Sequence, residues 1–250
     1  GKMAAALIGG VQSRGVGTGI DTQQIGSYSL EIEGELGGLA TLTSSSSYNK
    51  QKMFFNIDTS AVFAPLIENT FGVADVGSAI TTDNGLDKFS QEIRLASPAA
   101  DRLSWQIGGF YTHEHTVEFQ GLPLFDPLSG APVGGLPSLL HIYLRNTFEE
   151  VAAFGDATYH FGPRFDLTGG VRYSHNRQTG VQVSGGMFAG GDTDVALRSS
   201  DSSVTYLVSP RFHVDQDTMI YARLASGYRP GGPNADFGSF DAFVEQFKTA

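Results

Sequence analysis

The clearest candidate for chemistry is His113-Glu114-His115, a pair of imidazoles separated by one residue. In an extended strand alternate side chains lie on one face, so both histidines could contact the same zinc ion. The sequence identifies no further ligand beside this pair, and it contains no cysteine. We therefore predict no metal site, and we expect the two histidines to share one strand face with Tyr111 and Val117.

No motif predicts a cofactor or an enzyme. Gly15-x-Gly17-x-Gly19 resembles part of a dinucleotide-binding fingerprint, but its third glycine comes one position early and no helical period follows. We interpret that stretch as a loop. Neither a Gly-x-Ser-x-Gly nucleophile motif nor a His-Glu-x-x-His metalloprotease motif is present. We expect no bound cofactor and no catalytic residues.

Five residues are candidates for ligand contact. His141, Tyr143 and Arg145 close a long loop, and Tyr228 with Arg229 ends a predicted strand. Arginine and aromatic side chains suit anionic or aromatic ligands, through charge-assisted hydrogen bonds and stacking. The alternative is that both tyrosines belong to an interfacial aromatic girdle and that both arginines merely end strands.

Composition excludes several classes of protein. The net charge is -10, and the 16 Lys and Arg residues are dispersed, which argues against binding to nucleic acid. No apolar run approaches the roughly 20 residues that a membrane helix requires. A membrane barrel remains open, because its strands need only about 10 alternating residues each and leave the mean hydropathy near zero. The mean hydropathy of this chain is -0.10.

The chain is organised around a predicted hairpin over residues 89–119. Its second strand alternates between two faces with the period of a β-strand. The apolar face holds Leu103, Trp105, Ile107, Gly109, Tyr111 and Val117. The polar face holds Ser104, Gln106, Thr112, Glu114, Thr116 and Glu118. Strands longer than the usual 5 or so residues, with Trp and Tyr on the apolar face, predict a transmembrane barrel whose apolar side meets lipid.

The same pattern recurs along the sequence, so we predict an all-β fold. Residues 1–250 are expected to form one segment of an antiparallel up-and-down transmembrane β-barrel. The clearest predicted strands lie within residues 28–49, 89–119, 151–176 and 204–228. The predicted long outer loops are 50–86, 120–146, 178–202 and 229–250. The short turns are expected at 37–38, 98–101, 162–164 and 215–217. Alternation of short turns with long loops is typical of outer-membrane barrels, whose short turns face the periplasm.

Charged residues keep to the polar sides of the predicted strands. These residues are Glu92, Arg94, Glu114, Glu118, Asp156, Asp166, Arg172 and Arg211. An Arg or Lys on the lipid face costs about 2 to 4 kcal/mol at the bilayer midplane, so this placement predicts a polar barrel interior. The same alternation is also compatible with a soluble β-sandwich binding module whose polar face lies in water.

Three stretches resemble the barrel of the TonB-dependent outer-membrane receptors. They are residues 89–114, 151–176 and 209–235. The last of them contains a pattern that is characteristic of that family: Tyr-Ala, then four further residues, then Gly-Tyr-Arg-Pro-Gly-Gly. The resemblance implies a barrel of about 22 strands around an N-terminal plug. Neither a plug nor a TonB-binding box is recognisable, and roughly nine candidate strands would leave open edges in lipid. We therefore expect a segment of a larger barrel, as a fragment or as one part of a multi-chain assembly.

The resemblance also implies a function. Its members are active-transport receptors of the bacterial outer membrane that bind and import a scarce small molecule, most often a ferric siderophore. The implied partners are that ligand, outer-membrane lipid, the remaining strands of the barrel, and periplasmic TonB acting through the plug. A passive porin and a barrel-type surface adhesin are the alternatives.

Overall fold

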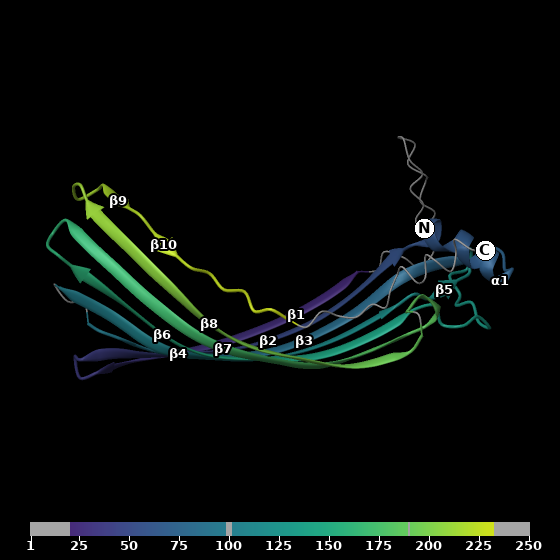
Figure 1. Ribbon diagram of the computed structural model, residues 1–250, viewed down its shortest axis with the longest axis horizontal. Coiled ribbons are helices and arrows are strands. Elements are labelled where there is room, and N and C mark those ends of the chain that lie inside the picture. The colour runs from purple at the N-terminus through teal and green to yellow at the C-terminus, as the bar shows by residue number, and fades with distance from the viewer. Residues whose placement is uncertain (1–20, 99–101, 190, 233–250) are drawn as a thin grey trace.

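The computed structural model describes residues 21–98, 102–189 and 191–232, and these form one curved antiparallel sheet (Figure 1). The long strands are β1 (Thr22–Leu36), β2 (Ala40–Asp58), β3 (Gly77–Ala96), β4 (Leu103–Gly121), β6 (His141–His160), β7 (Phe165–Gly185) and β8 (Thr193–His213). The short strands are β5 (Leu124–Phe125), β9 (Met219–Tyr221) and β10 (Leu224–Ala225). The long strands pair in chain order, β10 and β9 pair with β8, and β5 pairs with β3. This confirms the predicted up-and-down wall of a barrel segment.

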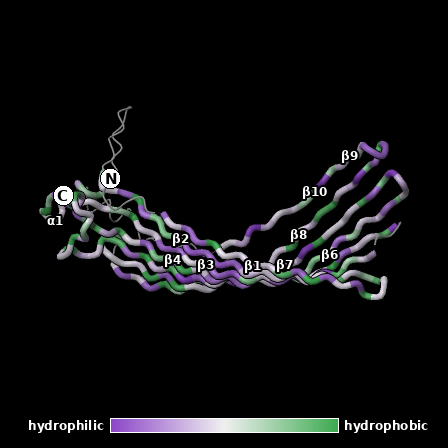
Figure 2. Tube along the Cα trace, turned by 180° about the vertical axis from the view of Figure 1, so that it is seen from behind, coloured by the Kyte–Doolittle hydropathy of each residue, from purple (hydrophilic) through white to green (hydrophobic). Residues whose placement is uncertain are grey.

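Hydrophilic and hydrophobic residues alternate along the strands (Figure 2), and the strand register places them on opposite faces of the wall. Ile107 is in register with Leu95 and Gly155, while its neighbour Gln106 is in register with Asp156 on the opposite face. The two faces also differ in burial. Thr112 on the polar face is buried by its neighbours, whereas Ile107 on the apolar face is 53% exposed. We call the polar face the inner face and the apolar face the outer face. The predicted strand faces are confirmed.

Two aromatic belts bound the apolar zone of the outer face. The outer belt consists of Tyr28, Tyr48, Phe89, Tyr111, Tyr173 and Tyr206. The inner belt also lies on the outer face, but at the end of the wall where the short turns are. It consists of Tyr159, Phe161, Phe165 and Phe212. On β7, Phe165 and Tyr173 lie eight residues apart, about 27 Å along a strand. A tilt of 35 to 45° reduces this span to about 20 Å, close to the apolar band of a transmembrane barrel.

The strands continue far beyond the outer belt, so the predicted outer loops were too long. Loops were predicted at 50–86, 120–146 and 178–202. In the structure the segments between the long strands are shorter, at 59–76, 122–140 and 186–192. Above the belt the apolar residues no longer keep to the outer face. On β2, for example, Lys50 and Lys52 lie on the outer face, whereas Met53, Phe55 and Ile57 lie on the inner face. The alternation that identified the lower part of each strand is therefore lost there, which explains the error.

The short turns predicted at 37–38, 162–164 and 215–217 lie between successive strands, at the end of the sheet opposite to the loops (Figure 1). The turn predicted at 98–101 falls largely on residues 99–101, which lie outside the described residues. The hairpin predicted over residues 204–228 differs, because its returning strand is divided into β9 and β10. The predicted loop 229–250 is described only to residue 232, and its remainder lies outside the described residues, as does the glycine motif at residues 15–19. Within the described ranges no helix is long and apolar enough to cross a membrane.

The loop between β2 and β3 contains α1 (Ser60–Phe71), which the sequence analysis did not predict. Phe63, Ile67 and Phe71 follow one another at four-residue spacing, so they form one apolar stripe along the helix. The helix ends at Gly72, whose φ of 63° is the left-handed conformation that a glycine adopts at a helix C-terminus. Ile67 is almost completely buried.

The apolar stripe of α1 packs against two other loops. The buried cluster consists of Ile67, Val76, Leu122, Leu124 and Leu139, with Phe63, Phe71, Val73, Ile80, Val133, Leu136, Leu140 and Phe188 around it. Phe188 belongs to η1 (Met187–Ala189), and its ring lies 5.6 Å from that of Phe63. Ile80 is an inner-face residue of β3, so the helix stands on the inner side of the rim. Three loops thus form one compact outer cap.

Candidate functional site

The inner face of the described strands is acidic. Its carboxylates are Glu31, Glu33, Glu35, Glu92, Glu114, Glu118, Glu150, Asp156, Asp166 and Asp201. Its cations are Lys88, Arg94, Arg172 and Arg211. Each of these cations pairs with a carboxylate of the same face, at distances from 2.7 to 3.7 Å. The wall therefore presents a surplus of negative charge to the barrel interior, and the predicted polar interior is confirmed.

Arg172 is the centre of the best-defined cluster on this wall. Its Nη2 donates to Oε1 of Glu150 at 2.7 Å, and its Nε donates to Oγ of Ser174 at 3.0 Å. Its guanidinium carbon lies 5.0 Å from the centre of the Phe110 ring and 5.9 Å from that of Phe154. Cation–π contacts and a charge-assisted hydrogen bond together hold the guanidinium in one orientation. The alternation assigned Arg172 to the polar side, but only the strand register brings these partners to it.

The Phe154 ring fits because β4 has a glycine beneath it. A Cβ atom at Gly108 would lie 2.4 Å from Cζ of Phe154 and 2.8 Å from the carbonyl oxygen of Ile93. The neighbouring Gly109, on the outer face, has nothing closer than 3.8 Å. The aromatic part of the Arg172 cluster therefore depends on a small residue at position 108.

A second cluster lies at the short-turn end of the inner face. Asp166 accepts hydrogen bonds through Oδ1 from His160, at 2.5 Å, and through Oδ2 from His213, at 2.9 Å. The guanidinium of Arg211 lies 3.7 Å from the same carboxylate. The cluster takes its residues from β6, β7 and β8, so it links these three neighbouring strands beside the short turns.

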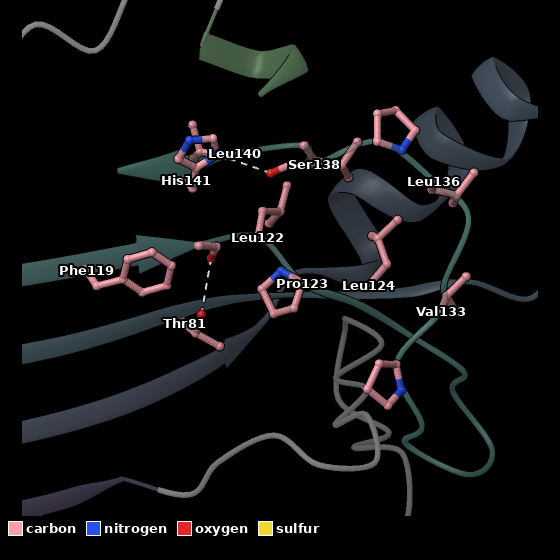
Figure 3. A pocket seen from close by; sticks show the side chains of 14 residues that line it. Thr81, Phe119, Leu122, Pro123, Leu124, Val133, Leu136, Ser138, Leu140 and His141 are labelled. Atoms are coloured by element: carbon pink, nitrogen blue, oxygen red, sulfur yellow. Dashed lines mark hydrogen bonds between the residues drawn. The ribbon is translucent and has the colours of Figure 1, made fainter. Parts of the chain in front are cut away.

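An open cavity of about 360 Å³ lies beneath the loop that joins β4 to β6 (Figure 3). Its walls are mainly apolar and include Phe119, Leu122 and Leu140, with a polar edge at Thr81. His141 forms part of the rim, where its Nδ1 lies 3.2 Å from Oγ of Ser138. A cavity of this composition can hold an apolar group of a small molecule.

The position of His141 depends on Gly185, its partner across to β7. A Cβ atom at Gly185 would lie 2.6 Å from Cε1 of His141 and 2.2 Å from Oδ1 of Asp192. The absence of a side chain at residue 185 therefore lets the imidazole lie against the neighbouring strand at the cavity rim.

The predicted ligand residues do not come together at one place. His141, Tyr143 and Arg145 occupy successive outer-face positions of β6. Tyr228 lies instead on the inner side, where its hydroxyl accepts a hydrogen bond from Nδ2 of Asn176, and Arg229 is exposed. A role for these five residues in ligand binding stays a prediction, and the first three cannot line the interior of the wall.

His113 and His115 both lie on the outer face, as expected. Nδ1 of His113 is 3.2 Å from Oε1 of Glu149, and Nδ1 of His115 is 3.4 Å from Oγ1 of Thr147. Among residues 21–98, 102–189 and 191–232, no three or more His, Cys, Asp or Glu side chains are grouped in a way that could hold a metal ion.

Two carboxylates outside the membrane-spanning part organise tight turns at opposite ends of the wall. The backbone N–H groups of Ser129 and Leu128 donate to Asp126 in the outer cap, and they lower the pKa of that carboxyl. At the other end, the backbone N–H of Asp217 donates to Asp215 and lowers its pKa. Both carboxylates thus stay charged at neutral pH and hold their turns through hydrogen bonds.

These features define a class: one polar-lined wall of an antiparallel membrane barrel with an outer loop cap. A family model for the TonB dependent receptor-like β-barrel matches residues 6–248. The chain therefore belongs to the TonB-dependent receptor family, as a segment of its barrel. This family is one of outer-membrane proteins.

Relatives and solved structures agree with this assignment. The pesticin receptor of Yersinia enterocolitica is 38% identical over 147 residues, which are 58% of this chain and 20% of the relative. The ferric yersiniabactin uptake receptor FyuA from Yersinia pestis shares the fold with a TM-score of 0.65 and 19% identity, over 84% of this chain and 29% of FyuA. The ferric-catecholate import receptor Fiu from E. coli K12, in its open form, has a TM-score of 0.59 and 13% identity, over 84% of this chain and 36% of Fiu. The chain thus spans about a fifth of the length of the curated relatives it matches, and these relatives are named as receptors.

Proposed function

We propose that this chain is part of an outer-membrane receptor that imports a small iron chelate with energy relayed by TonB. The observation that carries the proposal is the match of the receptor barrel family over residues 6–248. The names of the related structures support iron chelates as the ligand class, because FyuA takes up ferric yersiniabactin and Fiu imports ferric catecholates. The further partners are outer-membrane lipid, the remaining barrel strands and a plug through which TonB acts.

The outer cap supports a receptor rather than an open porin. Three loops pack together around Ile67, and α1 stands on the inner side of the rim. In a closed barrel, a helix in this position would narrow the entrance above the inner wall. A passive pore needs an unobstructed entrance, whereas a receptor needs loops ordered enough to present a binding surface. An adhesin would share such loops, so transport must be tested directly.

The charge of the inner wall supports a preference among ligands. Ten carboxylates and four paired cations line this segment, so a ligand with several negative charges would be repelled by it. We infer that the receptor prefers a chelate that is neutral or carries little negative charge. Ferric citrate, built from a tricarboxylate, is then expected to be a poor ligand.

The test is uptake of radioactive iron by cells that express the full-length receptor as their one iron-chelate receptor. Ferric yersiniabactin, a ferric catecholate and ferric citrate are supplied separately, each with and without a protonophore. Energy-dependent uptake of one chelate supports the proposal. Uptake that persists with the protonophore indicates a passive pore, and binding without uptake indicates an adhesin.

A further inference from the structure

The open cavity beneath the loop between β4 and β6 lies on the outside of the wall, away from the proposed route of import. Four residues of the long strands line it: Thr81 of β3, Phe119 and Gly121 of β4, and His141 of β6. The strand register places all four on the outer face. An imported molecule passes along the inner face, so this cavity is a separate candidate site.

The height of the cavity keeps it away from lipid tails. Phe119 follows Tyr111 of the outer belt by eight residues. This is about 26 Å along the strand and roughly 20 Å in height at a tilt near 40°. Aromatic belts mark the boundary between the hydrocarbon of a bilayer and water. A molecule that enters the cavity therefore comes from the water outside the cell and not from the membrane.

The walls of the cavity are fixed before any ligand arrives. The backbone N–H of Leu122 donates to the carbonyl oxygen of Leu140 at 3.1 Å, and that of Val133 donates to Leu124 at 3.0 Å. Proline residues, whose φ angle is restricted, form part of the lining at positions 123, 132 and 137. A ligand would thus enter a preformed cavity, at little cost in ordering the loop.

The charges in and around the cavity favour an uncharged ligand. No Asp, Glu, Lys or Arg is among the described residues that line it. A charged group would lose its hydration there and find no partner of opposite charge. Asp83, which is in register with Phe119, and Asp192, which lies with His141 around Gly185, stand just outside the lining. These two carboxylates would also repel an anion.

The polar edge of the cavity favours a ligand that donates a hydrogen bond. Thr81 donates its hydroxyl proton to the carbonyl oxygen of Gly121 at 3.4 Å, so toward a ligand its oxygen is an acceptor (Figure 3). The hydroxyl of Ser138, beside His141, is a second possible acceptor. The ring of Phe119 is 46% exposed, and aromatic rings gain energy by packing against one another.

We propose that this cavity binds a small uncharged aromatic molecule with one N–H or O–H donor, such as an indole or a phenol, and that the bound molecule stabilises the outer cap. Leu122, Leu124 and Leu139 line the cavity and also belong to the buried cluster that contains Ile67 of α1. A ligand that binds only while these side chains are packed stabilises the packed cap by mass action. The proposal goes beyond iron import and does not depend on which chelate the receptor takes up.

The experiment measures binding of radioactive indole to the full-length receptor in lipid nanodiscs by equilibrium dialysis. Nanodiscs without receptor give the amount that dissolves in lipid. We expect saturable binding of one indole per receptor above that amount. Gly121→Leu should fill the cavity, because a Cβ atom there makes only ordinary contacts, the nearest at 3.4 Å from Oγ1 of Thr81. Overfilling of this kind should weaken binding by roughly tenfold or more.

A matched control adds the same side chain outside the cavity. Gly85 lies on the same face of the wall, in register with Val117, and a Cβ atom there would lie 3.9 Å from the carbonyl oxygen of that residue. Gly85→Leu should leave the affinity for indole unchanged. Equal affinity in Gly121→Leu and Gly85→Leu would place the bound indole elsewhere on the receptor.

The chemistry of the probe tests the polar edge. Indene has the shape of indole but lacks its N–H group. In the double variant Thr81→Val, Ser138→Ala, the ratio of the affinities for indole and indene should fall by about 2- to 10-fold, which corresponds to the loss of one hydrogen bond. This ratio is measured within one variant, so it decides the question even if Gly121→Leu does not fold. Indole-3-acetate, an anion, should bind roughly tenfold more weakly than indole, or worse.

Protease digestion tests the effect on the outer cap. At ten times its dissociation constant, indole should slow cleavage of the loop between β4 and β6 by about tenfold in the wild type. It should have no effect in Gly121→Leu. Equal uptake by empty nanodiscs, an unchanged ratio of indole to indene in the double variant, or cleavage that indole does not slow would each overturn the proposal. None of these outcomes bears on iron uptake, which is measured separately.

Discussion

Ile107→Arg tests the assignment of the outer face to lipid. Ile107 lies four residues from Leu103 near one end of the apolar zone and four from Tyr111 in the outer belt. It is 53% exposed in this wall, so nothing on the protein shields an arginine placed there. Four residues are about 13 Å along the strand and about 10 Å in depth after tilting. The side chain would therefore stand near the bilayer midplane.

The expected cost follows from that depth. An arginine facing lipid at the midplane destabilises a membrane barrel by about 2 to 4 kcal/mol. Because 1.4 kcal/mol is a tenfold change, the ratio of folded to unfolded receptor should fall by roughly 30- to 1000-fold. The measurement is equilibrium unfolding in urea of the full-length receptor in phospholipid vesicles, with the mobility of unheated samples on gels as a second readout.

The neighbouring residue supplies the control. Gln106 faces the inner side, where its Nε2 lies 3.5 Å from Oδ2 of Asp156. Gln106→Arg introduces the same charge one residue away, next to a carboxylate and out of contact with lipid. We expect it to change the stability by less than about 1 kcal/mol. If Ile107→Arg folds as well as Gln106→Arg, the assignment of the two faces is wrong.

Three further predictions concern the wall and the cap. Gly108→Ala should destabilise the barrel by about 1 to 3 kcal/mol, because the new methyl group overlaps a ring and a carbonyl oxygen, whereas Gly109→Ala should be tolerated in the same urea titration. Ile67→Ala should open the outer cap to protease by removing its most buried side chain, at a local cost of about 2 to 5 kcal/mol, while exposed Val62→Ala leaves the digestion rate unchanged. Arg172→Gln should cost about 1 to 3 kcal/mol by removing the partner of a mostly buried carboxylate, and wild-type stability would disprove a structural role for that ion pair.

Much of the wall could be predicted from the sequence because lipid on one side and water on the other impose a strict alternation. The faces around Ile107 and Arg172 and the short turns at 37–38, 162–164 and 215–217 were predicted correctly. The limits of the outer loops could not be predicted, since above the outer belt the apolar residues no longer keep to the lipid-facing side of each strand. The helix around Ile67 was missed as well, although Phe63, Ile67 and Phe71 carry a detectable helical spacing.

The candidate sites were predicted less well than the wall. His141, Tyr143 and Arg145 were chosen for their chemistry, but their register places them on the outer face. Sequence assigns a side chain to one of two faces, and it does not say which residues on neighbouring strands lie beside it. The pairing of Arg172 with Glu150, across 22 residues of sequence, is therefore invisible without the sheet.

By itself the sequence determined the class of fold, the two faces of the wall and the family resemblance, because each of these depends on local alternation and short motifs. Only the tertiary structure decided which charges meet. Among the described residues it pairs Lys88, Arg94, Arg172 and Arg211 of the inner face with carboxylates, and it brings no carboxylate within ion-pair distance of Arg145, Arg177 or Arg198 on the outer face. The physical reason is that strand register joins residues far apart in the chain, and ion pairing depends on distances of a few ångströms.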